Sequence, residues 1–137
     1  MLQSYVGGEE NVSDNTTEKD LDAMFKAVPS KRNGLTFCTG SFGANHNNDL
    51  IKIADKYSKQ KRIHFLHARN IKYCDNEPIG SFIESGHFDK DGSLDLTLIV
   101  KKLVKNGFIG YVRPDHGRNI WGENGKPLKI YINSYHI

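Results

Sequence analysis

Residues 35–67, LTFCTGSFGANHNNDLIKIADKYSKQKRIHFLH, decide the fold class, because two apolar runs flank an amphipathic segment. The first run, residues 35–38, predicts a buried strand that ends in a Gly- and Ser-rich loop. The second run, residues 62–67, predicts another strand, with Ile63, Phe65 and His67 on the same face. Apolar residues at helical spacing predict a helix between the two strands: Leu50, Ile53, Ala54 and Tyr57. A strand, a helix and a strand in this order indicate a parallel βαβ unit.

Further elements are predicted on both sides of this unit. A capping-box pattern and a closing proline predict a helix over residues 17–29, and Asn47 or Asn48 is expected to cap the helix inside the βαβ unit. Residues 93–107 carry another apolar stripe, and residues 108–113 predict a third strand. The predicted fold class is therefore α/β, with about three parallel strands and flanking helices. Three strands cannot close a barrel, so we expect either a small open sheet or part of a larger fold.

Composition excludes several classes of protein. The chain has 137 residues, of which 26% are charged, and a net charge of only +3. The basic stretches at 59–62 and 101–102 lack interleaved aromatic residues, so we expect solvated helix faces and no nucleic-acid partner. No apolar run reaches the ~18 residues of a membrane helix, and the start does not resemble a secretory signal. Cys38 and Cys74 lie too far apart for a zinc knot or a disulfide framework. These features predict a cytoplasmic protein without a membrane partner, and residues 1–16 are expected to form a loop or a disordered tail.

Residues with reactive side chains follow each predicted strand. Cys38 ends the first strand, His67 and Arg69 follow the second, and Asp115 and His116 follow the third. Because parallel strands bring their carboxyl ends to the same edge of a sheet, we expect these side chains to converge. A thiolate, an imidazole and a carboxylate together form a mixed donor set for a divalent metal ion. The sequence thus predicts a metal site made by Cys38, His67 and Asp115.

Each of these residues also has a purely structural interpretation. Cys38 is compatible with a small buried apolar residue, His67 with a hydrogen-bonded strand end, and Asp115 with a helix cap or a turn. Glu84 and His87 lie in the long loop after the second strand, where they would either face a substrate or lie on the surface.

Four motifs in order give the sequence a resemblance to a known family. They are GLTFCTGSFG at 34–43, RIHFLHARN at 62–70, SFIESGH at 81–87 and VRPDHGR at 112–118. Together they resemble motifs of the mannonate dehydratases, and the similarity extends over residues 17–127.

The resemblance implies a (β/α)8 barrel of the xylose-isomerase type, of which these residues would form the C-terminal βα units. It implies a hydro-lyase that converts D-mannonate to 2-keto-3-deoxy-D-gluconate in hexuronate breakdown, with Mn²⁺ or Fe²⁺ as cofactor. Cys38, His67 and Asp115 match three of the family's four metal ligands, and His116 matches a residue proposed for proton transfer.

The mechanism suggests further site residues. The substrate carboxylate suits Arg69 and Arg113, because guanidinium groups bind carboxylates through two parallel hydrogen bonds. Arg113 could instead orient Asp115. We expect His87 to contact the substrate from the overhanging loop.

Two departures from the family pattern define the alternatives. The His-Pro-Asp-Asp-Pro-Pro motif with the fourth ligand is absent, and residues 128–137 form a divergent tail. We therefore expect an incomplete C-terminal part of a mannonate dehydratase that does not turn over at an enzyme-like rate alone. The alternatives are another divalent-metal sugar isomerase or endonuclease on the same barrel, and a non-catalytic truncated product that associates through exposed strand edges, for example as a homo-oligomer.

Overall fold

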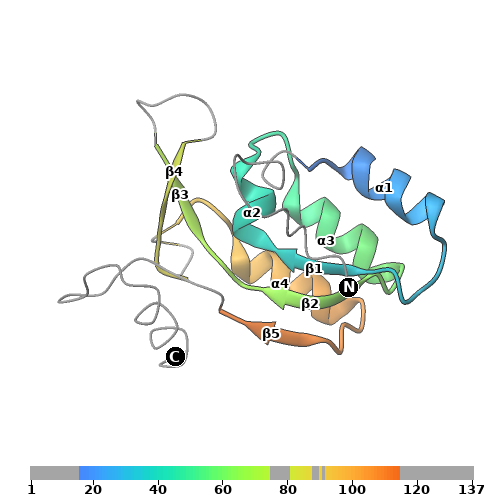
Figure 1. Cartoon of the computed structure of the whole chain (residues 1–137). Coiled ribbons are helices and arrows are strands. Elements are labelled where there is room, and N and C mark those ends of the chain that lie inside the picture. Colours follow the sequence, from blue (N-terminus) through green and yellow to red (C-terminus); the bar gives the residue numbers. More distant parts are fainter. Residues whose placement is uncertain (1–15, 75–80, 88–89, 91, 115–137) are drawn as a thin grey trace, which may run out of the picture.

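The computed structural model describes residues 16–74, 81–87, 90 and 92–114 of the chain. Four helices and five strands follow one another along these residues (Figure 1). They are α1 (Glu18–Ala27), β1 (Leu35–Cys38), α2 (Thr39–Ala44), α3 (Leu50–Lys59), β2 (Ile63–His67), β3 (Ile71–Tyr73), β4 (Phe82–Glu84), α4 (Leu96–Lys105) and β5 (Tyr111–Arg113). The predicted domain boundaries at residues 16, 127 and 128 stay predictions, because residues 1–15 and 115–137 lie outside the described residues.

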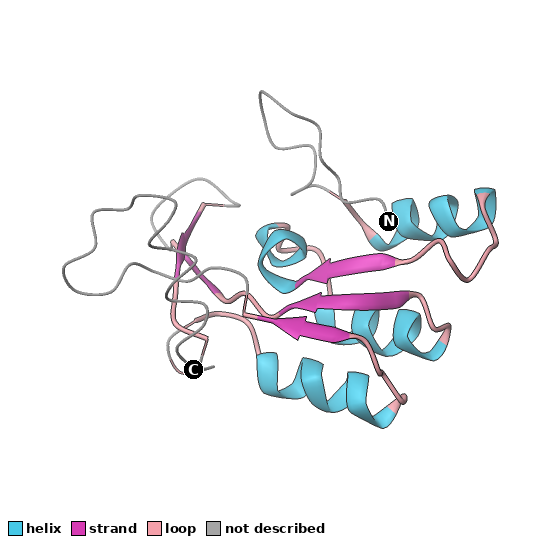
Figure 2. Ribbon diagram, turned by 60° about the horizontal axis from the view of Figure 1, so that its bottom comes forward, coloured by secondary structure: helices cyan, strands magenta, loops and turns pink. Residues whose placement is uncertain are grey.

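The central sheet has the order β1-β2-β5, and both strand pairs are parallel. This arrangement confirms the predicted βαβ unit and the α/β class. Figure 2 shows the three strands as one layer with helices packed along it. The core lies between the sheet and the helices, where Phe37, Leu66, Ile53 and Ile99 are almost completely buried.

One extra residue in β2 changes which side chains share a face. Leu35 pairs with Ile63, but the next residue of β1, Thr36, pairs with Phe65, so His64 has no counterpart. Ile63 is therefore buried in the core, whereas His67 lies on the opposite face. The predicted shared face of Ile63, Phe65 and His67 is confirmed for Phe65 and His67, whose ring centroids are 5.0 Å apart, but it is wrong for Ile63, because the irregularity interrupts the period-two alternation.

Aspartate side chains cap two of the helices, including α3, for which an asparagine cap was predicted. The capping box of Thr17 and Asp20 is present at the start of α1. Asp49, and neither of the two asparagines before it, caps α3 by accepting a hydrogen bond from the Lys52 N–H. Asp95 caps α4 in the same way. A carboxylate at this position also interacts favourably with the helix dipole, which explains the preference.

One helix and two strands were not predicted at all. α2 occupies the Gly- and Ser-rich segment after β1, and β3 pairs with β4 in an antiparallel hairpin within the predicted long loop. The hairpin projects beyond the carboxyl ends of the sheet strands (Figure 1). Asn70 joins it to the rest of the molecule: its buried side chain bonds the Leu94 backbone through both its oxygen and its nitrogen, each at 3.1 Å.

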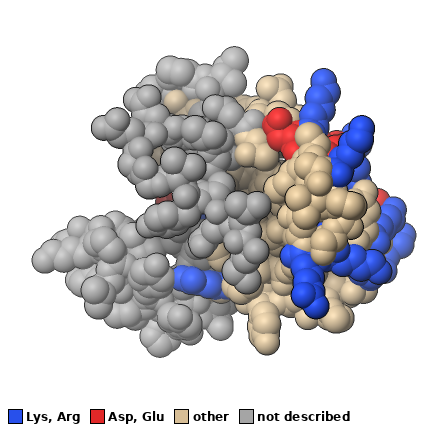
Figure 3. Space-filling model, turned by 45° about the vertical axis from the view of Figure 1, so that its right-hand side comes forward, with Lys and Arg blue, Asp and Glu red and all other residues tan. Residues whose placement is uncertain are grey.

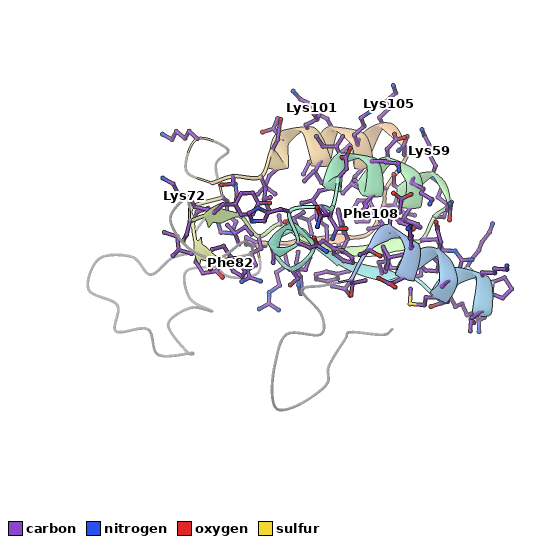
Figure 4. All side chains as sticks on the ribbon, turned by 90° about the horizontal axis from the view of Figure 1, so that it is seen from above. Lys59, Lys72, Phe82, Lys101, Lys105 and Phe108 are labelled. Atoms are coloured by element: carbon purple, nitrogen blue, oxygen red, sulfur yellow. The ribbon has the colours of Figure 1, made fainter. Side chains whose placement is uncertain are left out.

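Most lysines cover the outer helix surfaces, as predicted. Lys59 on α3 and Lys101 and Lys105 on α4 point outward (Figure 4). Basic side chains lie close to acidic ones on the face shown in Figure 3. Arg62 is an exception, because it is buried over the ring of Phe25 and donates to the carbonyl oxygens of Ser30 and Asn33. No helix among the described residues is long and apolar enough to cross a membrane.

The last strand and helix leave apolar side chains uncovered. Of the predicted stripe on α4, Leu96, Ile99 and Leu103 are buried, but Val100 and Val104 are exposed. The segment of β5 adds further exposed apolar side chains: Ile109, Tyr111 and Val112. Within the described part of the chain, β5 pairs only with β2, so one edge of this strand is open.

The buried phenol of Tyr57 predicts a loss of stability in alkali. Its oxygen lies 2.9 Å from Asp22 Oδ1 and 3.0 Å from the Glu18 carbonyl, with Lys56 beside the ring. Burial, followed by the hydrogen bond to Asp22, raises the pKa of Tyr57 above its usual range. The unfolded phenol ionises near about pH 10, so stability is complete below that pH and falls as the pH rises toward the folded-state pKa.

Tyr57→Phe is expected to cost about 1 kcal/mol at neutral pH and to reduce the fall in stability above about pH 10. Urea unfolding at neutral pH measures the first effect, and urea unfolding above about pH 10 measures the second. Tyr111→Phe, which alters an exposed phenol, is the control. An equally steep alkaline loss in Tyr57→Phe would show that other groups cause it.

Candidate metal and substrate site

Cys38 and His67 end neighbouring parallel strands and are paired in register. Paired residues of parallel strands project to the same side of the sheet, so the sulfur and the imidazole share a face. This face is opposite to the core, where the alternating residues Phe37 and Leu66 are buried. Both side chains are half-buried, as expected for groups at the edge of a site.

The buried hydroxyl of Thr39 fixes the distance between the two strand ends. Its Oγ1 lies 2.5 Å from the Arg69 carbonyl oxygen and 3.1 Å from that of His67, and it accepts a hydrogen bond from the Arg69 N–H at 3.0 Å. The residue after Cys38 is thus bonded to the backbone on both sides of Ala68. Sequence reasoning did not identify Thr39, although its place directly after a strand-end cysteine is a usable signal.

Arg69 lies at the same edge, and its guanidinium already binds a carboxylate of the protein. Nε donates to Glu84 Oε2 at 3.1 Å, and Nη2 pairs with Glu84 Oε1. Burial opposes the charge of the guanidinium, yet the hydrogen bonds and attraction to Glu84, and then to the Cys38 sulfur, raise the pKa of Arg69. Substrate binding by Arg69 stays a prediction that would require the guanidinium to be shared with Glu84.

His87 reaches the end of the third strand from the hairpin segment. Its Nε2 lies 3.1 Å from the carbonyl oxygen of Pro114. A carbonyl oxygen can only accept, so this contact assigns a proton to Nε2. The predicted loop therefore overhangs the predicted edge, although the contact made by His87 is with the backbone.

The third strand end is placed only in part. Arg113 of β5 pairs in register with His67, so it belongs to the same row as Cys38. Asp115 and His116 follow directly but lie outside the described residues, so their predicted roles are not tested. In the described part of the chain, no three His, Cys, Asp or Glu side chains are grouped to hold a metal ion.

The donor chemistry of the described pair nevertheless fits a divalent transition-metal ion. A thiolate and an imidazole on one face are ligands for such ions, and two protein ligands leave room for a third from the neighbouring strand. A cavity of about 490 Å³ lies elsewhere, between the first turns of α1 and α3. Its lining includes Glu18 and Lys52, which form an ion pair at 2.9 Å, so it resembles a polar contact between helices.

Comparison with known proteins decides the family. The family model described as D-mannonate dehydratase matches residues 13–134. The chain belongs to the mannonate dehydratase family. The resemblance stated from the four motifs is thereby confirmed.

Individual relatives give the extent of the similarity. The mannonate dehydratase of Thermotoga maritima is 44% identical over 112 residues, which are 82% of this chain and 30% of that protein. The mannonate dehydratase of Lactococcus lactis is 46% identical over 111 residues, again 30% of its length. The crystal structure of mannonate dehydratase from Streptococcus suis serotype 2 covers 84% of this chain with a TM-score of 0.75 and 32% identity, and 32% of that chain is matched.

These relatives confirm the predicted fold as well as the family. The sheet and its helices superimpose on part of a mannonate dehydratase, which agrees with the predicted partial (β/α)8 barrel. The chain spans about 30% of the length of the curated relatives it matches.

Proposed function

We propose that this chain carries part of the active site of an enzyme that dehydrates D-mannonate to 2-keto-3-deoxy-D-gluconate. The observation that supports this most directly is the register pairing of Cys38 with His67, on one face, in a member of the mannonate dehydratase family. The proposal includes a place in hexuronate (glucuronate) breakdown in the cytoplasm.

The proposed cofactor is Mn²⁺ or Fe²⁺, held by Cys38, His67 and Asp115 with a further ligand from outside the described residues. When bound, such an ion would act as a Lewis acid toward the carboxylate and the 2-hydroxyl of the substrate. We assign binding of the substrate carboxylate to Arg113, which lies in register with Cys38 and His67. Arg69 would contribute if its guanidinium bound the substrate and Glu84 at the same time. His87 would line the substrate from the hairpin side.

His116 is proposed to move a proton during elimination. The reaction removes the proton from C2 and protonates the leaving 3-hydroxyl, so it needs a base and an acid near the carboxylate. A histidine next to Asp115 can serve either step, because its ordinary pKa lies near neutrality.

Association of copies of the chain is proposed on separate grounds. The exposed apolar side chains of α4 and of residues 109–112 lie next to the edge of β5 that pairs with no strand among the described residues, and such edges favour pairing with another chain. A homo-oligomer would cover Val104 and Ile109.

A chimera tests the proposed activity. Residues 17–127 replace the matching segment of the Thermotoga maritima enzyme, and formation of the 2-keto-3-deoxy product is measured under reducing conditions with Mn²⁺ or Fe²⁺. We expect turnover in the chimera and a loss of about 10³-fold or more in its His67→Ala variant, because ligand and substrate placement fail together. His64→Ala, on the same strand, is the control. A folded chimera with no product would contradict the proposal.

The 137-residue chain alone is expected to lack an enzyme-like rate. Catalytic groups need placement within about half an ångström, and in the described part of the chain no strand pairs with the outer edge of β5 to support that side of the site. The same assay on the purified chain measures this. Rapid turnover by the isolated chain, abolished by His67→Ala, would show that the described strands suffice.

A further inference from the structure

The Cys38 sulfur lies in a hydrogen-bonded cluster with Ser41, to which the proposed reaction gives no role, and with Arg69. Ser41 Oγ donates to Cys38 Sγ at 3.3 Å, and Arg69 Nη1 donates to Ser41 Oγ at 3.5 Å. The Ser41 hydroxyl thus links the guanidinium to the sulfur, and attraction to Cys38 is one of the causes that raise the pKa of Arg69. The sulfur therefore has a hydroxyl and a cation beside it, one from α2 and one from the end of β2.

The path of the Arg69 side chain is fixed along its whole length. Its stem crosses Gly40, where an added Cβ would lie 2.5 Å from Cδ and 2.7 Å from Cγ. Its head is held by both oxygens of Glu84. Only 11% of the side chain is exposed, so the guanidinium cannot swing away from the sulfur without breaking the ion pair.

Glu84 brings the hairpin into this arrangement. It is the last residue of β4, and the partner strand β3 makes a separate contact with α2, from Tyr73 Oη to the Gly43 carbonyl at 2.8 Å. The Glu84 pair is thus one of several hairpin contacts, and it is the one whose arginine is also linked to the sulfur through Ser41. Mutation of Glu84 therefore changes a hairpin contact that involves Arg69, whereas mutation of Tyr73 changes a hairpin contact that does not.

We propose that Ser41 and Arg69, the latter held by Glu84, are positioning residues for the Cys38 sulfur. They orient the sulfur toward the face shared with His67 and draw electron density from it, so that a bound divalent cation receives less. Hydrogen bonds to ligand sulfur atoms tune a metal centre in this way, and loss of the partners that hold a ligand in its orientation costs about 10- to 100-fold in metal affinity. This inference rests on the metal site of the proposed function.

The test uses Co²⁺ titrated into the reduced full chain, followed by the near-ultraviolet absorption band of a thiolate bound to Co²⁺. The band is expected in the Cys74→Ser variant and absent in Cys38→Ser. Ser41→Ala and Glu84→Gln are expected to move the band to longer wavelength, because a sulfur without its donors gives up electrons more readily. Glu84→Gln and Arg69→Lys are also expected to weaken Co²⁺ binding about tenfold.

Tyr73→Phe is the matched control, because it removes a hairpin contact that does not reach the sulfur. It is expected to leave the band and the affinity unchanged. An unchanged band in both Ser41→Ala and Glu84→Gln would overturn the proposal while leaving the metal site intact. If the parent chain gives no band that depends on Cys38, the proposed metal site fails, and this inference fails with it. Should Glu84→Gln not fold, Ser41→Ala decides, since it leaves the ion pair in place.

Discussion

Asn70→Asp is expected to destabilise the protein by about 3 kcal/mol, although it changes only one atom of the side chain. The Asn70 amide donates to the Leu94 carbonyl and accepts from the Leu94 N–H. A carboxylate can keep the second bond, but it places an oxygen against the Leu94 carbonyl in a site with no solvent exposure. The new group must either stay charged without a cation or take up a proton, and both cost free energy.

The same change at an exposed asparagine gives the control. Asn47→Asp is expected to alter the free energy of unfolding by no more than about 0.5 kcal/mol. Urea unfolding of both variants near neutral pH provides the measurement. Equal stabilities for the two would mean that the Asn70 bonds contribute little to joining the hairpin and α4.

Cys38→Ser is expected to lower Zn²⁺ affinity about 100-fold or more, because serine cannot supply a thiolate. Zn²⁺ should bind the parent chain more tightly than Mn²⁺, following the usual order of divalent ions at sulfur and nitrogen ligands. His67→Ala is expected to cause a loss of similar size, since the two side chains share one face of the sheet. Calorimetric titration under reducing conditions measures both variants.

Two matched variants separate ligand loss from general damage. Cys74→Ser removes the other thiol, and His64→Ala removes an exposed imidazole from the same strand. Neither is expected to change the binding isotherm. If Cys38→Ser binds Zn²⁺ as the parent does, the cation is held elsewhere in the chain.

The sequence predicted the helices and the parallel strands well because their apolar residues repeat at regular spacing. The stripe of α3 and the capping box of α1 are local signals, and tertiary contacts only reinforce them. α2 and the β3–β4 hairpin were missed because each element is short, so no period extends far enough to be recognised. Their stability comes from contacts with distant residues, such as the bonds of Asn70 to Leu94.

The candidate site was predictable in composition but not in its internal bonds. Position at a strand end identified Cys38 and His67, and the register confirms that they lie side by side. The Arg69–Glu84 pair joins residues 15 positions apart, and no sequence pattern distinguishes it from a free arginine. Arg62 illustrates the same limit, because its burial depends on the packing of α1 over the sheet.

β2 contains one residue, His64, more than its pairing with β1 requires. Removing it would leave Ile63 and Phe65 adjacent, and regular alternation would then keep Ile63 in the core and His67 on the site face. Adding a residue between Phe65 and His67 would have the opposite result, since the imidazole would turn toward the helices. We therefore expect β2 to tolerate the deletion of His64 but not an insertion between Phe65 and His67. Only the insertion would turn the His67 side chain away from the site.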